Sequence, residues 1–193
     1  MAHACHVHVP GILDIPINDK GKPTFKLDQL APLNGFAHEN AHDALDDVLA
    51  TLHIMNLIKS RAPELWEKMM NNSSKLNVTH LLETGTPLCL SESHFGNIYR
   101  YAVAAAGSNP NNPNEYGVVD LQHDPIDLLD LTVEELVGIR TSKNKRIRTV
   151  KSNTQPILME LNERSLNPVV QEVGYLELER RASLIISNPK FCD

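Results

Sequence analysis

The stretch ENAHDALDDVLAT places one histidine among three aspartates, His42 with Asp43, Asp46 and Asp47. Carboxylates beside an imidazole suit hydrolysis of a phosphodiester with divalent cations, because the acids hold the metal and the neutral histidine takes a proton from the attacking water. On a helix, His42 and Asp47 would lie about 140° apart, so they converge only where His42 lies at a frayed N-terminal end. The alternative is that acids in a first turn complement the helix dipole, and we assign Asp43 and Asp46 to that role.

A second candidate is the segment HACHVH, with His3, Cys5, His6 and His8 in six residues. Zinc ligands usually come as spaced pairs, and so tight a run does not easily surround one tetrahedral ion. This spacing argues against a zinc site. The chain has three cysteines at wide spacing, an arrangement that fits no disulfide framework and predicts free thiols.

The charge distribution supplies a third candidate. The chain has 18 basic and 24 acidic side chains, a net charge of −6. Six basic residues with no acid among them fall in one segment: Arg140, Lys143, Lys145, Arg146, Arg148 and Lys151. Such a segment attracts phosphate backbones, and the aromatic residues before it would let the bases of a single strand stack. Those residues are Phe95, Tyr99, Tyr101 and Tyr116. The alternatives are a solvated basic loop and aromatic side chains that pack in a core.

A long helix is the element that must position His42 and the aspartates. Asn40 is suited to the N-cap, and the helix is expected to end near Ser60. Apolar residues recur at helical spacing and predict one apolar face, formed by Ala44, Leu45, Val48, Leu49, Leu52, Met55 and Ile58. Pro63 then starts a second helix, PELWEKMMN.

The rest of the chain is predicted to be loop and short strands. Residues 16–36 form a loop with a helical turn at LDQLAPL, and NNSSK is a linker. The predicted strands are THLLET, PLCLS, IYRYAVAAA, YGVVDL, RIRTVKS and PILMEL. A helix at LTVEELVGIR with Thr132 as its N-cap interrupts them, and a last helix runs from Tyr175 to Ile186. The pattern predicts an α+β protein with a β-rich second part.

Composition excludes several classes of protein. At 193 residues with 41% hydrophobic and 22% charged side chains, the chain fits one ordinary domain or two small ones and not a disordered protein. No stretch approaches the roughly 18 apolar residues of a membrane helix, and the N-terminal segment does not resemble a secretion signal. We therefore expect a cytoplasmic protein that does not bind membranes.

The segment from Gly21 to Lys59 resembles the last part of the catalytic domain of the exodeoxyribonuclease I family, bacterial enzymes that digest single-stranded DNA from the 3′ end. The matching motif is H-x4-D, within NAHDA and Asp47, preceded by an F-[KR]-L-[DE]-x-L block at Phe25–Leu30. Five later segments resemble the family's SH3-like domain and the start of its C-terminal helical region. They are PLCLSESHFG, VVDL, LTVEELVGIRTSK, PILMELNERSL and LERRASLIISNPK, so practically the whole chain is covered.

The resemblance implies three parts. Residues 1–62 would be the helix-rich C-terminal part of an RNase H-like exonuclease domain, residues 63–170 an SH3-like β-rich domain, and residues 171–193 the start of a helical region. By resemblance, His42 is the general base and Asp47 is the last of four carboxylates that bind two Mg²⁺ ions. The implied partners are single-stranded DNA and the acidic C-terminal tail of the single-stranded-DNA-binding protein. The family resemblance suggests a monomer.

One departure from the family is decisive for activity. The family begins with a strand carrying D-x-E and adds a further metal-binding aspartate, yet no D-x-E occurs in this chain. We therefore expect a fragment of an exonuclease, truncated at both ends, whose isolated chain has little or no activity. Its apolar helix face around Val48 and Leu52 would have lost the sheet that it covers and would favour self-association. The alternative function is a non-catalytic module that binds single-stranded DNA or docks a partner.

Overall fold

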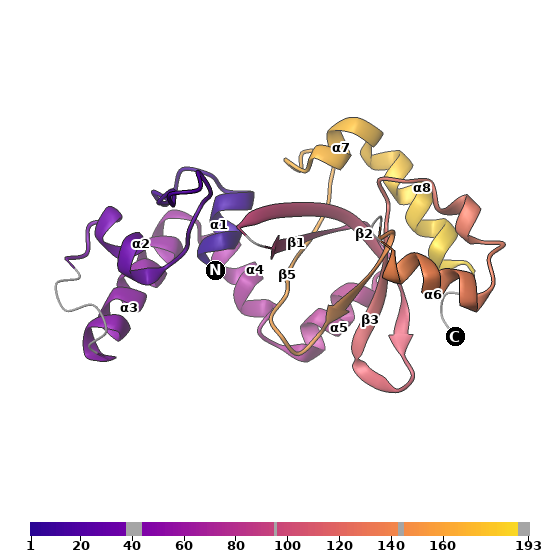
Figure 1. Ribbon diagram of the computed structural model, residues 1–193, viewed down its shortest axis with the longest axis horizontal. Helices are drawn as coiled ribbons and strands as arrows, with labels where there is room; N and C mark the ends of the chain where they lie inside the picture. Colours follow the sequence, from indigo (N-terminus) through magenta and orange to yellow (C-terminus); the bar gives the residue numbers. More distant parts are fainter. Residues whose placement is uncertain (38–43, 95, 143–144, 189–193) are drawn as a thin grey trace. The chain divides into compact units, whose positions relative to one another are not determined.

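The computed structural model describes residues 1–37, 44–94, 96–142 and 145–188. Contacts divide the chain into two compact units, Met1–Met70 with Ser93–Tyr99, and Asn71–Glu92 with Arg100–Asp193. The architecture is α+β, as predicted (Figure 1). The three-part division at residues 62/63 and 170/171 stays a prediction, because it concerns family domains and not contacts within this chain.

The first unit is built around a long helix, α3 (Ala44–Arg61). Helices α1 (Ala2–His8) and α2 (Leu27–Leu33) pack against it, and α4 (Pro63–Asn71) follows. Each helix buries a few small or apolar residues: Ala4, Cys5 and Val7 from α1, Leu30 and Ala31 from α2, and Ala50, Ile54 and Ile58 from α3. Pro63 begins α4 as predicted, because its missing N–H would be unsatisfied there in any case.

The predicted apolar face of α3 is exposed over most of its length. Leu45, Val48, Leu49 and Leu52 are 66, 54, 43 and 48% exposed. Ile58, which belongs to the predicted face, is instead buried together with Ala50 and Ile54 on another side of the helix. Among the described residues, the face around Val48 and Leu52 is thus exposed, as expected. The predicted start of the helix at Asn40 lies outside the described residues.

The second unit contains a five-stranded sheet in the order β4-β3-β2-β1-β5. The strands are β1 (Leu88–His94), β2 (Asn97–Asn109), β3 (Asn112–Asp120), β4 (Ile147–Lys151) and β5 (Ile157–Glu160). β1 pairs antiparallel with β5, and β3 pairs antiparallel with both β2 and β4. Five of the six predicted strands are therefore confirmed.

Both faces of this sheet are packed, because successive side chains alternate between them. On one face, Leu88, Leu90 and Val103 meet helix α5 (Lys75–Glu83). On the other face, Cys89 and Ala102 meet α7 (Pro168–Val173) and α8 (Tyr175–Ile186). A third cluster lies beside η1 (Pro125–Leu128) and α6 (Val133–Thr141). Figure 1 shows α5 on one side of the sheet and α8 on the other.

The predicted strand THLLET is wrong, because these residues lie in and just after α5. The Ser74 hydroxyl accepts a hydrogen bond from the Asn77 N–H and caps the helix. Val78 and Leu82 are four residues apart and both are buried against the sheet, so tertiary packing selects helical over strand geometry. The predicted helix at Thr132 is confirmed, with a capping box between Thr132 and Glu135.

Candidate functional site

The two predicted catalytic residues differ in how far the structure describes them. His42 lies outside the described residues. Asp47 lies in the first turn of α3, where its charge complements the positive end of the helix dipole. The Thr51 hydroxyl donates a hydrogen bond to the Asp47 carbonyl oxygen at 2.8 Å.

Asp47 belongs to the packed side of α3. It precedes Ala50, Ile54 and Ile58 by three, seven and eleven residues, which is the spacing of one helix side. Those three residues are buried and Asp47 is half-buried, whereas its neighbour Val48 is exposed. The Asp47 side chain thus lies at the N-terminal end of the buried stripe, on the side away from the exposed leucines.

The described residues do not fit a two-metal centre. Among residues 1–37, 44–94, 96–142 and 145–188, no group of three or more His, Cys, Asp and Glu side chains could hold an ion. Mg²⁺ is usually bound through one or two carboxylates plus waters and substrate phosphates, and a two-ion clamp needs more carboxylates than one. Asp47 is therefore one ligand at most of such a centre.

His3, Cys5 and His6 of the HACHVH segment serve packing in α1. The His3 and His6 rings lie 5.5 and 5.9 Å from the Phe25 ring, measured between centroids. Cys5 is a free, buried thiol, and burial raises its pKa to about 11. Burial likewise lowers the pKa of His3. A protonated thiol is a poor nucleophile, so Cys5 serves packing and is not a reactive group.

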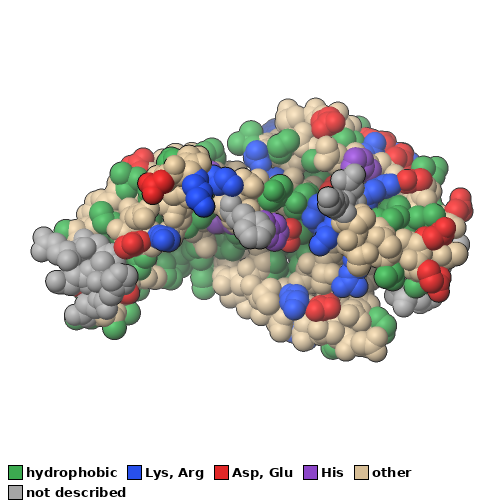
Figure 2. Space-filling model, viewed as in Figure 1, with side chains coloured by type: hydrophobic (Ala, Val, Ile, Leu, Met, Phe, Trp, Pro, Cys, Tyr) green, Lys and Arg blue, Asp and Glu red, His purple; other side chains and the backbone are tan. Residues whose placement is uncertain are grey.

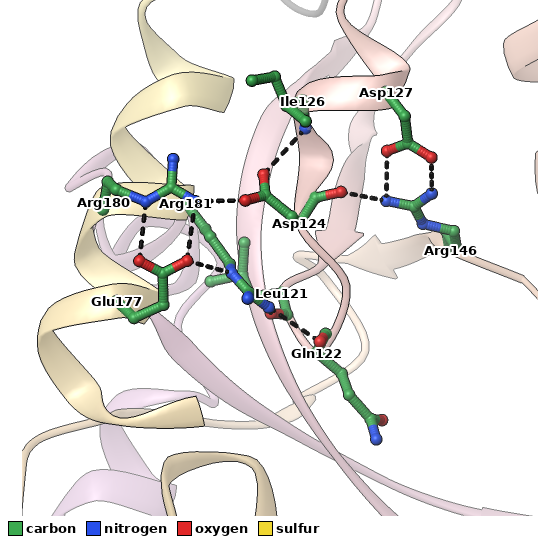
Figure 3. A network of polar contacts seen from close by, with 9 residues as sticks. All are labelled: Leu121, Gln122, Asp124, Ile126, Asp127, Arg146, Glu177, Arg180 and Arg181. Atoms are coloured by element: carbon green, nitrogen blue, oxygen red, sulfur yellow. Dashed lines mark hydrogen bonds and ion pairs between the residues drawn. The ribbon is translucent and has the colours of Figure 1, made fainter. Parts of the chain in front are cut away.

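The basic stretch is largely paired with acids. Arg146 forms a bidentate ion pair with Asp127, at 2.5 and 2.9 Å (Figure 3). The Lys151 ammonium lies 3.4 Å from the Glu115 carboxylate. Figure 2 accordingly shows basic side chains interspersed with acidic ones, and no continuous basic surface on the face in view. The segment therefore presents less net positive charge than its sequence suggests.

Arg148 is held by the sheet. Its guanidinium carbon lies 3.4 Å from the centroid of the Tyr101 ring, and a guanidinium nitrogen lies 3.8 Å from the Asp120 carboxylate. Burial raises the pKa of Asp120, although Arg148 opposes this shift. Only 17% of the Arg148 side chain is exposed. This cation–π contact ties β4 to β2 and uses the guanidinium that was predicted to bind DNA.

The remaining predicted DNA contacts fall into three groups. Arg140 and Lys145 are exposed, and Lys143 lies outside the described residues. Tyr116 is buried in the core and its hydroxyl donates a hydrogen bond to Glu83. For this ring the alternative of core packing is therefore confirmed. Tyr99 is 39% exposed, whereas Phe95 lies outside the described residues.

An ion-pair network fastens α8 to the sheet (Figure 3). Arg180 pairs with both Glu177 and Asp124, and Arg181 pairs with Glu177. Arg181 also donates to the carbonyl oxygens of Leu121 and Gln122, both at 2.8 Å. The two arginines lower the pKa of Glu177 to about 2.

Sequence reasoning missed the acidic partners because they lie in an earlier strand and the turn after it. Antiparallel pairing sets Glu115 directly opposite Lys151 and brings Asp120 to the start of β4. A signal was present: aligning NEYGVVD antiparallel to RIRTVK matches acids to bases at both ends of the pair. The charges of the basic segment are paired with acids only once β3 lies beside β4, and the segment taken alone does not contain those acids.

Comparison with known proteins decides the family. No family model matches the sequence. Exodeoxyribonuclease I of Haemophilus influenzae is 36% identical over 141 residues, which is 70% of this chain and 30% of that protein. The crystal structure of Escherichia coli exonuclease I in complex with a dA16 oligonucleotide matches with a TM-score of 0.73 and 28% identity, covering 98% of this chain and 43% of that one. The chain belongs to the exodeoxyribonuclease I family.

The relation to exodeoxyribonuclease I covers almost all of this chain but only part of its relatives. The chain spans about a third of the length of the curated relatives that it matches. The ExoI/SSB-Ct complex is another structural match, with a TM-score of 0.72 and 27% identity over 98% of this chain. Among the helices that the structure describes, none is both long and apolar enough to cross a membrane.

Proposed function

We propose that this chain is the part of an exodeoxyribonuclease I that joins the last catalytic residues to a β-rich unit that holds single-stranded DNA. His42 would act as the general base, and Asp47 would bind one of two Mg²⁺ ions. Residues 1–62 would complete an RNase H-like domain, and the sheet would be SH3-like. The reaction is hydrolysis of the phosphodiester at the 3′ end, in which water attacks phosphorus and the 3′ oxygen leaves.

The placement of Asp47 carries this proposal. A carboxylate that only stabilised the helix dipole would do so equally well on the solvent side of the first turn. Asp46 and Asp47 are both half-buried, but Asp47 lies nearer the middle of the helix side that carries Ala50, Ile54 and Ile58. A half-buried acid on a rigid helix suits a metal ligand, because packing fixes its rotamer.

We propose further that the isolated chain binds single-stranded DNA without hydrolysing it. No D-x-E occurs in the sequence, and the described residues offer no group of three metal-binding side chains. A lone carboxylate leaves both ions short of ligands, whereas strand binding needs only positive charge and stacking surfaces.

The predicted DNA contacts carry different weight in this proposal. Arg140 and Lys145 are exposed and able to meet phosphates. Arg146 and Arg148 are paired with Asp127 and Asp120, so we expect them to stabilise the sheet and not to bind phosphates directly. We also propose that the acidic C-terminal tail of the single-stranded-DNA-binding protein is a partner. The ExoI/SSB-Ct complex among the structural matches supports this proposal.

Digestion of a 5′-labelled single-stranded oligonucleotide by the purified chain tests the proposal. With Mg²⁺ we expect intact oligonucleotide and salt-sensitive binding of it. A 3′-end ladder that disappears with EDTA and in His42→Ala would contradict the inactivity of the chain and support the role of His42. Absence of both binding and hydrolysis would contradict a role of this chain in DNA binding and would favour a partner-docking module.

A further inference from the structure

A surface in the first unit has the chemistry of a single-strand binding site outside the basic stretch. It combines the loop of residues 17–26 with the described residues of the hairpin tip, 93–94 and 96–99. These tip residues belong to β1 and β2, but their contacts place them in the first unit. The loop carries Lys20, Lys22 and Lys26 against one acid, Asp19, and the tip carries no acid. We call this the lysine–tyrosine surface.

The two segments lie in direct contact. A β-carbon added at Gly96 would lie 3.1 Å from Cδ of Lys22, so the backbone of the tip lies against this lysine side chain. Gly96 has φ +74°, a conformation that favours glycine and lets the chain turn there. The tip therefore lies beside Lys22 and the loop that carries Lys20 and Lys26, although more than 70 residues separate Lys22 from Gly96 along the chain.

The lysine loop is built as a tight turn. The Asn18 side-chain oxygen accepts hydrogen bonds from the Lys20 and Lys22 N–H groups at 2.9 and 3.1 Å. The Asn18 N–H donates to the Lys22 carbonyl oxygen at 2.9 Å, and Ile17 pairs with Pro23 as an isolated bridge. A turn held in this way loses little backbone entropy when a ligand binds to its lysines.

The tip supplies rings as well as backbone. The His94 and Tyr99 rings lie 6.0 Å apart between centroids. Both side chains are exposed, as are Lys20 and Lys26. Aromatic faces that lie near lysines are the combination that holds single strands, because bases stack on the rings while ammonium groups meet phosphates.

We propose that the lysine–tyrosine surface binds single-stranded DNA, with Lys20, Lys22 and Lys26 on phosphates and Tyr99 stacked on a base. This inference rests on the proposed function, because it takes the same ligand. It assigns DNA binding to residues of the first unit, in addition to the predicted basic stretch, in which Arg146, Arg148 and Lys151 are paired with acids. The favoured ligand is a single strand, because duplex bases are already stacked on one another and closed to Tyr99.

The test is fluorescence anisotropy of a 5′-labelled oligothymidylate titrated with the full chain at several salt concentrations. The variant is Lys20→Gln/Lys22→Gln/Lys26→Gln, and the matched control is Lys59→Gln/Lys68→Gln/Lys75→Gln, which removes the same charge from exposed positions outside the surface. We expect the variant to weaken binding about tenfold or more. The slope of log K against log salt concentration should fall in magnitude by about two, because each phosphate contact contributes roughly 0.7. The control should retain most of the affinity.

Tyr99→Ala and Tyr99→Phe provide a second readout. Alanine should weaken binding about tenfold, while phenylalanine keeps the ring and should bind like the wild type. Equal affinity and salt slope in the two triple variants would overturn this inference and leave the proposed function standing. An unmodified chain that does not bind the oligonucleotide would overturn both. Unchanged circular dichroism of the variants excludes unfolding as the cause of lost binding.

Discussion

The sheet of the second unit and helix α3 of the first show two ways in which apolar residues are used in one chain. Every strand of the sheet contributes to a buried cluster, and helices cover both faces. Helix α3 buries one narrow stripe, while Leu45, Val48, Leu49 and Leu52 face outward. The sheet is thus packed within this chain, whereas α3 presents a second apolar face with nothing described upon it.

The apolar pattern of α3 predicts burial, but only part of that pattern is buried in the structure. A helix that is apolar on two sides is typical of an element buried between two layers. In this chain the described residues supply one layer. The described residues offer no group of three metal-binding side chains around Asp47, so the incomplete packing and the metal site that we propose to be incomplete both involve α3.

The largest expected effect is on the core of the sheet. Leu88→Ala removes a fully buried side chain between β1 and α5, and we expect it to lower the free energy of unfolding by about 2–5 kcal/mol. Leu52→Ala on the exposed face of α3 should change it by less than about 0.5 kcal/mol. Urea denaturation followed by circular dichroism measures both. Equal losses in the two variants would break the comparison.

Two glycines should respond with opposite signs. Gly85 has φ +76°, a conformation that strains alanine, so Gly85→Ala should destabilise the second unit by about 1–3 kcal/mol. Gly138 lies within α6, where an added β-carbon meets nothing within 4 Å. Gly138→Ala should therefore stabilise by about 0.5–1 kcal/mol. Melting temperatures measure both changes, and a stabilising Gly85→Ala would contradict the left-handed backbone conformation at Gly85.

Polar substitutions on the exposed face of α3 are expected to leave the stability of the chain unchanged. We expect the combined variant Leu45→Gln/Val48→Gln/Leu49→Gln/Leu52→Gln to bind less of the dye ANS and to associate less in sedimentation experiments, because the four side chains form one exposed apolar patch. The control is Leu76→Gln/Leu176→Gln, which alters leucines that are even more exposed but lie far apart in the sequence. The same fall in dye binding in both variants would show that the α3 face is not distinctive.

The smallest effect is the pH response of the ion pairs that fasten α8. Arg180 and Arg181 lower the pKa of Glu177 from its ordinary value of 4.5 to about 2. A depressed carboxylate pKa adds stability that is present above about 4.5 and is lost as pH falls toward 2. Glu177→Gln should flatten this part of the stability curve. The change should be small because the side chains are exposed to solvent, and an unaltered acid limb would contradict the pairing.

Local signals in the sequence predicted most elements of the fold. Alternation gave five strands, and Thr132 and Pro63 marked helix starts because capping and proline geometry act within a few residues. The strand predicted at THLLET was wrong because burial of Val78 and Leu82 against the sheet is a tertiary effect. The basic stretch likewise lost its acid-free character once β3 and β4 paired. Of the two catalytic predictions, Asp47 lies on a described helix and both roles stay proposals.

Hydrogen exchange of the unmodified chain tests most directly the claim that a fully packed sheet in the second unit is joined to an incompletely packed first unit. Amides of residues 102–106 in β2 and 116–120 in β3 should exchange only through global unfolding, because these parts of the two strands are buried on both faces. Amides of α3 should exchange through local opening, about a hundredfold faster or more. Equal protection of α3 and the sheet would contradict the claim and show that the first unit is as fully packed as the second.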